Sequence, residues 1–184
     1  MTEEKTNVPK VKKGVKKTFF DVNAQITSTK IQLYGSSAEE LVGKVVKLDL
    51  TRSLKGKNFE LKLRVKNTPE GLEGEPTSIV LVGSYIRRTM RTGIDYVEDS
   101  FVAELKDGKA RVKPFMIARN KVSRAVRREL RNNSRKFLEE YFKARTAKEA
   151  FSDITTNKVQ KELFVRLKKV YPLAFCEIRV FELV

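Results

Sequence analysis

The chain has 184 residues, 40% of them hydrophobic, and it carries 39 lysines and arginines against 23 aspartates and glutamates, a formal net charge of +16. This length suits one domain, or one domain with a tail, and it is sufficient to bury a core. The excess of positive charge favours a polyanionic partner, nucleic acid first, and no apolar run approaches the length of about 18 residues that would predict a membrane-spanning helix.

Residues that could support catalysis are scarce. The chain has no His, the usual general base near neutral pH, and its one Cys, Cys176, allows neither an internal disulfide nor a Cys-rich zinc site. It has no glycine-rich loop of the kinds that cradle phosphates. We therefore expect no catalytic residue, metal or cofactor, and no membrane partner. A metal nuclease built from carboxylates alone stays open as an alternative.

The pattern divides the chain into a basic tail, residues 1–18, and a single domain, residues 19–184. The tail is poor in apolar residues, and such segments are disordered when free and often fold against nucleic acid. A merely solubilising tail is the alternative. No secretory leader is expected, because no apolar segment follows Met1. The candidate RNA contacts of the tail are Lys10, Lys12, Lys13, Lys16 and Lys17.

The domain is expected to begin with short elements. Residues 19–22 are the first segment that should anchor to the core, and residues 31–33 predict a short strand after it. A single helical turn is expected over residues 36–43, where Ser36 and Glu39 have the spacing of a capping box and the final glycine can end the turn.

Two strands are predicted next, at residues 44–50 and 58–66, and the loop at 53–57 is short enough to make them antiparallel neighbours. The second strand has the clearest alternation of apolar and charged residues in the chain. Residues 68–76 are expected to be a loop because of their Pro and Gly content. The continuous β-branched run at 77–83 predicts a central strand buried on both sides.

A short basic helix is predicted over residues 85–91, with Ser84 as its cap and a glycine at its end. Ile86 and Met90 are expected to face inward. The outward arginines, which are candidate RNA contacts, are Arg87, Arg88 and Arg91. The alternative is that these arginines pair with nearby acids, namely Asp95, Glu98 and Asp99.

A β-hairpin should follow, with strands at residues 96–105 and 110–117. Asp107 and Gly108 form a preferred tight turn, because its backbone positions need positive φ. Pro114 lacks an amide donor, so it implies either an edge position or a bulge.

The stretch from residue 118 to residue 145 is the element around which we expect the domain to be organised. It contains no Pro or Gly, and it reads as one long amphipathic helix. The predicted core face is Val122, Val126, Leu130, Asn133, Phe137, Tyr141 and Ala144. The opposite face carries Arg124, Arg127, Arg128, Arg131 and Arg135, about one turn apart, a spacing that suits successive phosphates. A solvated surface helix is the alternative. The remaining candidate RNA contacts are Arg111, Arg119 and Lys121.

The C-terminal part is predicted to contain a short helical piece at residues 147–152, an amphipathic helix at 157–170 and a final strand at 174–184. The apolar face of the helix is Val159, Leu163, Leu167 and Val170, and Pro172 stops it. One face of the strand carries Cys176, Ile178 and Val180, so Cys176 is interpreted as a small core residue. Together the elements predict an α+β fold: an antiparallel β-barrel or strongly curved sheet, with the long basic helix and the C-terminal helices packed on it.

Several segments, in this order and spacing, are shared with one protein family. They are Val42-Gly43-Lys44-Val45, Ser84-Tyr85-Ile86-Arg87-Arg88, Lys106-Asp107-Gly108 with Arg111-Val112, Ala118-Arg119, Val170-Tyr171-Pro172-Leu173 and Glu177-Ile178-Arg179. Over roughly residues 17–184 the chain thereby resembles the archaeal and eukaryotic small-ribosomal-subunit protein family eS-one, or S-three-A-e in older usage. It is more similar to the archaeal form. It departs from the family at Phe19-Phe20, where Trp-Tyr is usual, and at residues 22–25, which replace a Pro-rich segment.

The resemblance implies a structural constituent of the small ribosomal subunit, with a β-barrel core, flanking helices and no enzymatic activity. It implies binding to small-subunit ribosomal RNA on the platform near the messenger exit, with neighbouring small-subunit ribosomal proteins and messenger RNA at the exit as further partners. The location would be the cytoplasmic ribosome. A free RNA- or DNA-binding regulatory protein is the alternative, although the sequence shows no helix-turn-helix, RNA-recognition-motif or zinc pattern.

Overall fold

The computed structural model describes residues 17–184 except 25, 28, 29, 55 and 70, and four of the tail lysines, Lys10, Lys12, Lys13 and Lys16, lie outside the described residues. The strands are β1 (Thr18–Ala24), β2 (Lys30–Gly35), β3 (Val45–Asp49), β4 (Phe59–Thr68), β5 (Gly71–Leu81), β6 (Tyr96–Glu98), β7 (Phe101–Glu104), β8 (Lys109–Ala118) and β9 (Leu173–Leu183). The helices are α1 (Ala38–Leu41), α2 (Gly83–Thr89), α3 (Arg124–Lys143), α4 (Ala147–Thr155) and α5 (Lys158–Lys168). The predicted α+β class is therefore confirmed.

One mixed sheet runs through the molecule in the order β2-β1-β5-β9-β8-β6, with β3 and β4 branching from β5 and with β7 beside β8. Strand β5 joins the two ends. One of its edges pairs with β4 along its length, while β1 and β9 pair with its first and second halves. The sheet is open, and the β1–β5 pairing is parallel. The predicted antiparallel barrel is not confirmed, because the ladder passes from one end of the molecule to the other instead of returning to its first strand.

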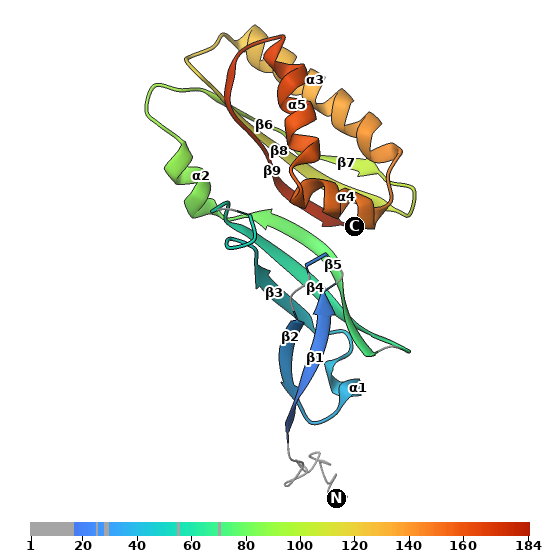
Figure 1. Ribbon diagram of the computed structural model, residues 1–184. Helices are drawn as coiled ribbons and strands as arrows, with labels where there is room; N and C mark the ends of the chain where they lie inside the picture. Colours follow the sequence, from blue (N-terminus) through green and yellow to red (C-terminus); the bar gives the residue numbers. More distant parts are fainter. Residues whose placement is uncertain (1–16, 25, 28–29, 55, 70) are drawn as a thin grey trace, which may run out of the picture.

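Helices cover the sheet at one end of the molecule but not at the other (Figure 1). Helices α3, α4 and α5 gather over strands β6–β9, whereas β1–β4 and α1 extend away from them. The main core lies mostly under the helices, and its largest fully buried side chains there are Phe115, Phe142, Phe151 and Phe181. A second, smaller core at the other end consists of Val22, Leu41, Val65 and Leu72.

Strand β4 confirms the alternation seen in the sequence, because Phe59, Leu61, Leu63 and Val65 are all buried. It pairs antiparallel with β3, as expected. The predicted loop at residues 68–76 is wrong, because β5 already begins at Gly71. Pro76 stands where the β4–β5 register shifts, and a Cβ on Gly74 would lie only 3.2 Å from a methyl carbon of Leu63. Here Pro and Gly mark a bulge and a close approach of two strands.

Strand β9 also carries a bulge, because Arg179 is the extra residue between the pairs Lys113–Val180 and Pro114–Ile178. The register of β8 and β9 shifts at Pro114, which has partner strands on both sides, so the bulge alternative is confirmed and the edge alternative is not. Beyond the shift the inward face of β9 changes. Cys176 and Ile178 are buried as predicted, but Phe181 takes the buried place expected for Val180. A bulge inserts one residue, which moves every later side chain to the other face.

The predicted hairpin is present, but its first strand is broken into β6 and β7, which both pair with β8. The turn is wider than the predicted two-residue type. The amide of Leu105 donates to the carbonyl of Gly108 at 2.8 Å, and Gly108 is not among the residues with positive φ. The Asp-Gly pair therefore marks the turn correctly without adopting the conformation that motivated the prediction.

The two short helices differ from expectation at their caps. The cap of α1 is Ser37, and Ser36 instead donates to the carboxylate of Glu40. That hydroxyl contact holds the pKa of Glu40 at about 2. Helix α2 begins one residue before Ser84, which therefore caps nothing, and it ends before Met90. Met90 is 39% exposed instead of buried, because it lies outside the last turn.

The C-terminal helices match the predicted pattern more closely. Helix α4 runs three residues beyond the predicted end, and Thr146 and Glu149 cap its start reciprocally. Helix α5 starts after Asn157, which has a left-handed φ of 60°, and it ends before the Tyr171-Pro172 pair. Val159, Leu163 and Leu167 are fully buried, as expected.

Candidate nucleic-acid interface

The long basic helix begins six residues later than the sequence suggested. Residues 119–123 are not helical, and Ala118 still belongs to β8. Ser123 caps α3, its hydroxyl accepting from the amide of Val126 at 3.4 Å. Just before it, the amide of Val122 donates to Asp95 at 2.9 Å, so the start of α3 is tied to the segment that leads into β6.

The buried face of α3 is Leu130, Ser134, Leu138 and Phe142. Of the predicted core face, Leu130 is confirmed, Val126, Asn133, Phe137 and Tyr141 are half-buried, and Ala144 is exposed beyond the helix. A stripe with four-residue spacing rotates about the helix axis by about 40° at each step. The buried stripe therefore lies away from the arginines at the start of α3 and moves towards them near its end. Ser134 is compatible with burial because its hydroxyl donates to the carbonyl of Arg131 at 2.8 Å.

The first half of α3 forms one wall of a groove of about 440 Å³, which faces the start of β6. We call this concavity the arginine groove. It is lined by Arg124, Arg127, Arg128, Arg131, Asn132, Tyr96 and Val97. Arg124, Arg128 and Arg131 are exposed and Arg127 is half-buried. Sequence reasoning found the four arginines, but it did not find Tyr96 or Asn132, because their proximity depends on how α3 packs against β6.

Among the described residues, none of these four guanidinium groups makes an ion pair or a side-chain hydrogen bond. Two acids beside the groove are engaged elsewhere: Asp95 accepts from the amide of Val122, and Glu98 pairs with Arg179. Residues 124–131 of α3 hold four arginines and one acid, Glu129, so positive charge dominates this wall. Cations gathered on one concave wall concentrate positive potential there. Guanidinium forks match phosphate oxygens in geometry, so the arginine groove is suited to a phosphate-bearing ligand.

The second half of α3 is different, although it is also basic. Arg135 donates to Glu139 at 2.8 Å, and its guanidinium carbon lies 5.5 Å from the centre of the Phe101 ring. The hydrogen bond to Glu139 raises the pKa of Arg135. The structure thus does not bring Arg135 into the arginine groove with the four arginines that precede it.

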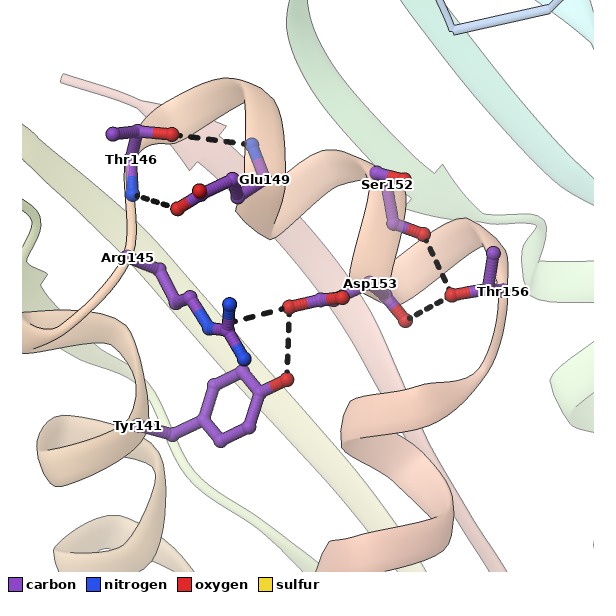
Figure 2. A network of polar contacts seen from close by, with 7 residues as sticks. All are labelled: Tyr141, Arg145, Thr146, Glu149, Ser152, Asp153 and Thr156. Atoms are coloured by element: carbon purple, nitrogen blue, oxygen red, sulfur yellow. Dashed lines mark hydrogen bonds and ion pairs between the residues drawn. The ribbon is translucent and has the colours of Figure 1, made fainter.

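The end of α3 is fastened to α4, as Figure 2 shows. Arg145 and the hydroxyl of Tyr141 converge on the carboxylate of Asp153, at 3.5 Å and 2.8 Å. Burial and this contact raise the pKa of Tyr141 to about 12. The adjacent Thr146–Glu149 capping box fixes the turn between the helices. Arg135, Tyr141 and Arg145 thus make contacts within the protein, unlike the four arginines of the groove.

The other predicted RNA contacts lie apart from the arginine groove. Arg87, Arg88 and Arg91 are exposed on or just after α2, and Arg88 also reaches Asn58 at 3.4 Å and covers the ring of Tyr85. The alternative pairing with Asp95, Glu98 and Asp99 does not occur. Three further cations, Arg111, Arg119 and Lys121, are exposed on β8 and in the segment before α3. Lys17 lies 5.8 Å from the ring of Tyr34, at the other end of the molecule.

Sequence reasoning also missed a buried ion pair. Glu177 on β9 is only 5% exposed, and it pairs with Lys57, which also donates to Asn157 at 2.8 Å. Burial raises the pKa of Glu177 despite this lysine. The neighbouring Cys176 is buried too, and burial raises its pKa to about 12, which agrees with a small core residue. In the sequence Glu177 stands among apolar strand residues, which was the available signal.

Within the described residues there is no group of three or more Cys, Asp or Glu side chains that could hold a metal ion. The same part of the chain has no helix long and apolar enough to cross a membrane. The fold and the site thus define a basic α+β protein with an arginine groove beside its longest helix.

Comparison with known proteins gives the family. The family model described as the Ribosomal S3Ae family matches residues 6–184, so the chain belongs to that family. It is similar to the small ribosomal subunit protein eS1 of Nanoarchaeum equitans (strain Kin4-M), with 27% identity over 180 residues that cover 91% of this chain and 89% of the relative. It is also similar to eS1 of Methanothermobacter thermautotrophicus (strain Delta H), with 26% identity over 133 residues, 69% of this chain and 68% of the relative. The expected family is therefore confirmed, and the chain is a ribosomal protein of the archaeal type.

Proposed function

We propose that the protein is a structural constituent of the small ribosomal subunit, that it binds ribosomal RNA through the arginine groove, and that it supports translation without catalysing a reaction. Its family membership supports the ribosome as the setting. The resemblance adds the platform near the messenger exit of the cytoplasmic ribosome as its position. Neighbouring small-subunit proteins, and messenger RNA at the exit, would be its other contacts.

The observation that supports RNA binding is the set of four arginines in the arginine groove, whose guanidinium groups pair with no acid in the described part of the chain. Each arginine that meets a phosphate releases condensed counterions, which makes such binding favourable and dependent on salt. The remaining predicted cations, on α2, on β8 and in the tail, are further proposed contacts. They would extend the interface along the RNA, because phosphate contacts position a protein without needing one continuous pocket.

Sedimentation of cell lysate through a sucrose gradient tests the proposal. We expect the protein to travel with the small subunit at low salt, and we expect a variant with Arg124→Gln, Arg128→Gln and Arg131→Gln to move to the top of the gradient at lower salt than the natural protein. A matched control is Lys148→Gln, a change of an exposed cation on α4 outside the arginine groove. If the natural protein stays at the top even at low salt, the ribosomal proposal is wrong, and a free nucleic-acid-binding regulator becomes the better account.

A further inference from the structure

The arginine groove contains more than cations. A flat row of arginines would be sufficient to follow the phosphates of a duplex, but this surface is hollow, and an aromatic ring and a side-chain amide line it together with the arginines. Its volume of about 440 Å³ lies within the range of about 300–1,000 Å³ that is usual for sites that enclose a small ligand. The groove can therefore accept a ligand group that enters the surface.

The aromatic ring is that of Tyr96, which is 48% exposed at the first residue of β6. It is held firmly. Its backbone pairs with Ile117 of β8, and its ring lies 5.8 Å from the ring of the buried Phe115, at an interplanar angle of 36°. A ring that is both fixed and half-exposed loses little freedom when a flat partner stacks on it. Stacking of one nucleic-acid base on an aromatic side chain contributes about 1–3 kcal/mol.

Asn132 supplies the amide. It is exposed on α3, one residue after Arg131, and its side chain makes no hydrogen bond within the described part of the chain. An amide offers both a donor and an acceptor, which suits the edge of a base. Arginines on the same wall can hold the phosphates that flank that base. Sequence-specific recognition of RNA commonly combines these three elements, and it uses unpaired nucleotides because the bases of a duplex are stacked and out of reach.

We propose that the arginine groove accepts one unpaired nucleotide, with its base stacked on Tyr96 and its edge near Asn132, while Arg124, Arg127, Arg128 and Arg131 hold the flanking phosphates. The inference rests on the proposed function, and it specifies the class of RNA: a bulge or a loop, not an uninterrupted duplex. Tyr96 is then a specificity residue, and the arginines supply affinity.

Two RNA hairpins of equal stem length test this, one fully paired and one with a single-nucleotide bulge. Their affinities for the full-length protein are measured by fluorescence anisotropy over a series of salt concentrations. We expect the bulged RNA to bind at least about 5-fold more tightly, which corresponds to about 1 kcal/mol of stacking. Tyr96→Leu should bring the ratio of the two affinities to about 1 while the salt dependence keeps its slope, whereas Tyr96→Phe should keep the preference for the bulged RNA. Tyr34→Leu is the matched control, because Tyr34 is 57% exposed at the other end of the molecule.

The outcomes separate the two proposals. If neither RNA binds with a salt-dependent affinity, the proposed function fails. If both RNAs bind equally, or if Tyr34→Leu removes the preference as completely as Tyr96→Leu, the single-nucleotide inference is overturned while RNA binding stands. Photocrosslinking of a 4-thiouridine at the bulge gives a second measurement that needs no variant. A crosslink to the segment around Tyr96 supports the inference, and a crosslink only to other segments overturns it.

Discussion

The two halves of α3 carry similar charges and use them differently. Arg131 and Arg135 are one turn apart, yet the guanidinium of Arg131 lines the arginine groove and makes no ion pair with any described residue, while Arg135 is bound to Glu139 and lies over Phe101. The difference arises because the buried stripe rotates around the helix, so that the second half of α3 packs against β7 and reaches α4 through the Tyr141–Asp153 hydrogen bond. A basic helical face in a sequence can therefore contain arginines that are available to an outside partner and arginines that are bonded within the protein. Only the packing of the helix distinguishes the two kinds.

The largest expected effect comes from the buried stripe. Leu138→Ala should lower the free energy of unfolding by about 2–5 kcal/mol, because it opens a cavity where the side chain is fully buried. The salt dependence of RNA binding should not change, since Leu138 is not part of the arginine groove. Chemical denaturation and salt-dependent binding would be measured on the same preparation. Val165→Ala, at a position 63% exposed, is the control, and an equal loss in that variant would show that the method does not report on the core.

The ion pair Lys57–Glu177 contrasts with the arginines of the groove, because its charges are bonded to each other inside the protein. Lys57→Met should cost about 1–3 kcal/mol at neutral pH, because it leaves a buried carboxylate without its cation, while the partly exposed position of Lys57 limits the loss. Burial raises the pKa of Glu177, so this carboxyl binds its proton more readily in the folded than in the unfolded state. Its contribution to stability is complete below the unfolded pKa and is lost as pH rises through the folded pKa. The penalty of Lys57→Met should therefore shrink as the pH falls towards 4.5, the unperturbed value. If the loss in the free energy of unfolding caused by Lys57→Met did not depend on pH, the charge of Glu177 would not be stabilised by Lys57.

Weakening the contacts of Tyr141 and Arg145 with Asp153, at the end of α3, should lower the free energy of unfolding by less. Tyr141→Phe removes the hydrogen bond to Asp153 but keeps the ring and the Arg145 contact, so we expect a loss of about 1 kcal/mol in the free energy of unfolding. Binding of RNA should be unaffected. A weaker RNA affinity in this variant, with stability unchanged, would mean that the second half of α3 also belongs to the interface.

The smallest expected effect is a change in the salt dependence of RNA binding, and it tests the difference between the two halves of α3 most specifically. Arg131→Gln should make the plot of log affinity against log salt concentration shallower by about 0.9, the value for one phosphate contact on duplex DNA. Arg135→Gln should leave that slope nearly unchanged, because Arg135 is already engaged within the protein. Equal changes in the two variants would contradict the distinction between the halves of α3.

Local patterns predicted much of the fold. The alternation in β4, the apolar face of α5 and the α+β class could all be read from the sequence, because each depends on the period of a single element. The failures depend on contacts between elements. Gly74 and Pro76 looked like loop residues, but they serve a close approach and a bulge within β5, and the bulge opposite Pro114 exchanges Val180 for Phe181 in the core.

The candidate site shows the same limit. The arginines of α3 were visible as a charged helical face, but their division between Arg131 and Arg135 was not. Tyr96 lies far from α3 in the sequence and reaches the arginine groove only because β6 packs beside the helix. Glu177 pairs with Lys57, which lies 120 positions away in the sequence. Contacts between such distant residues leave no periodic pattern in the sequence, so a single sequence does not reveal them.

The central claim is that the arginine groove binds RNA phosphates, and the salt dependence of binding tests it most directly. The measurement compares the natural protein with the variant Arg124→Gln, Arg128→Gln and Arg131→Gln on the same RNA hairpin, after thermal unfolding has shown equal stability. Gln keeps nearly the same helix propensity as Arg, so the fold should be retained. We predict a slope shallower by roughly two to three units, from about 0.9 for each lost contact. A variant that keeps the full slope would contradict the account, because the arginine groove would then be ordinary solvated surface.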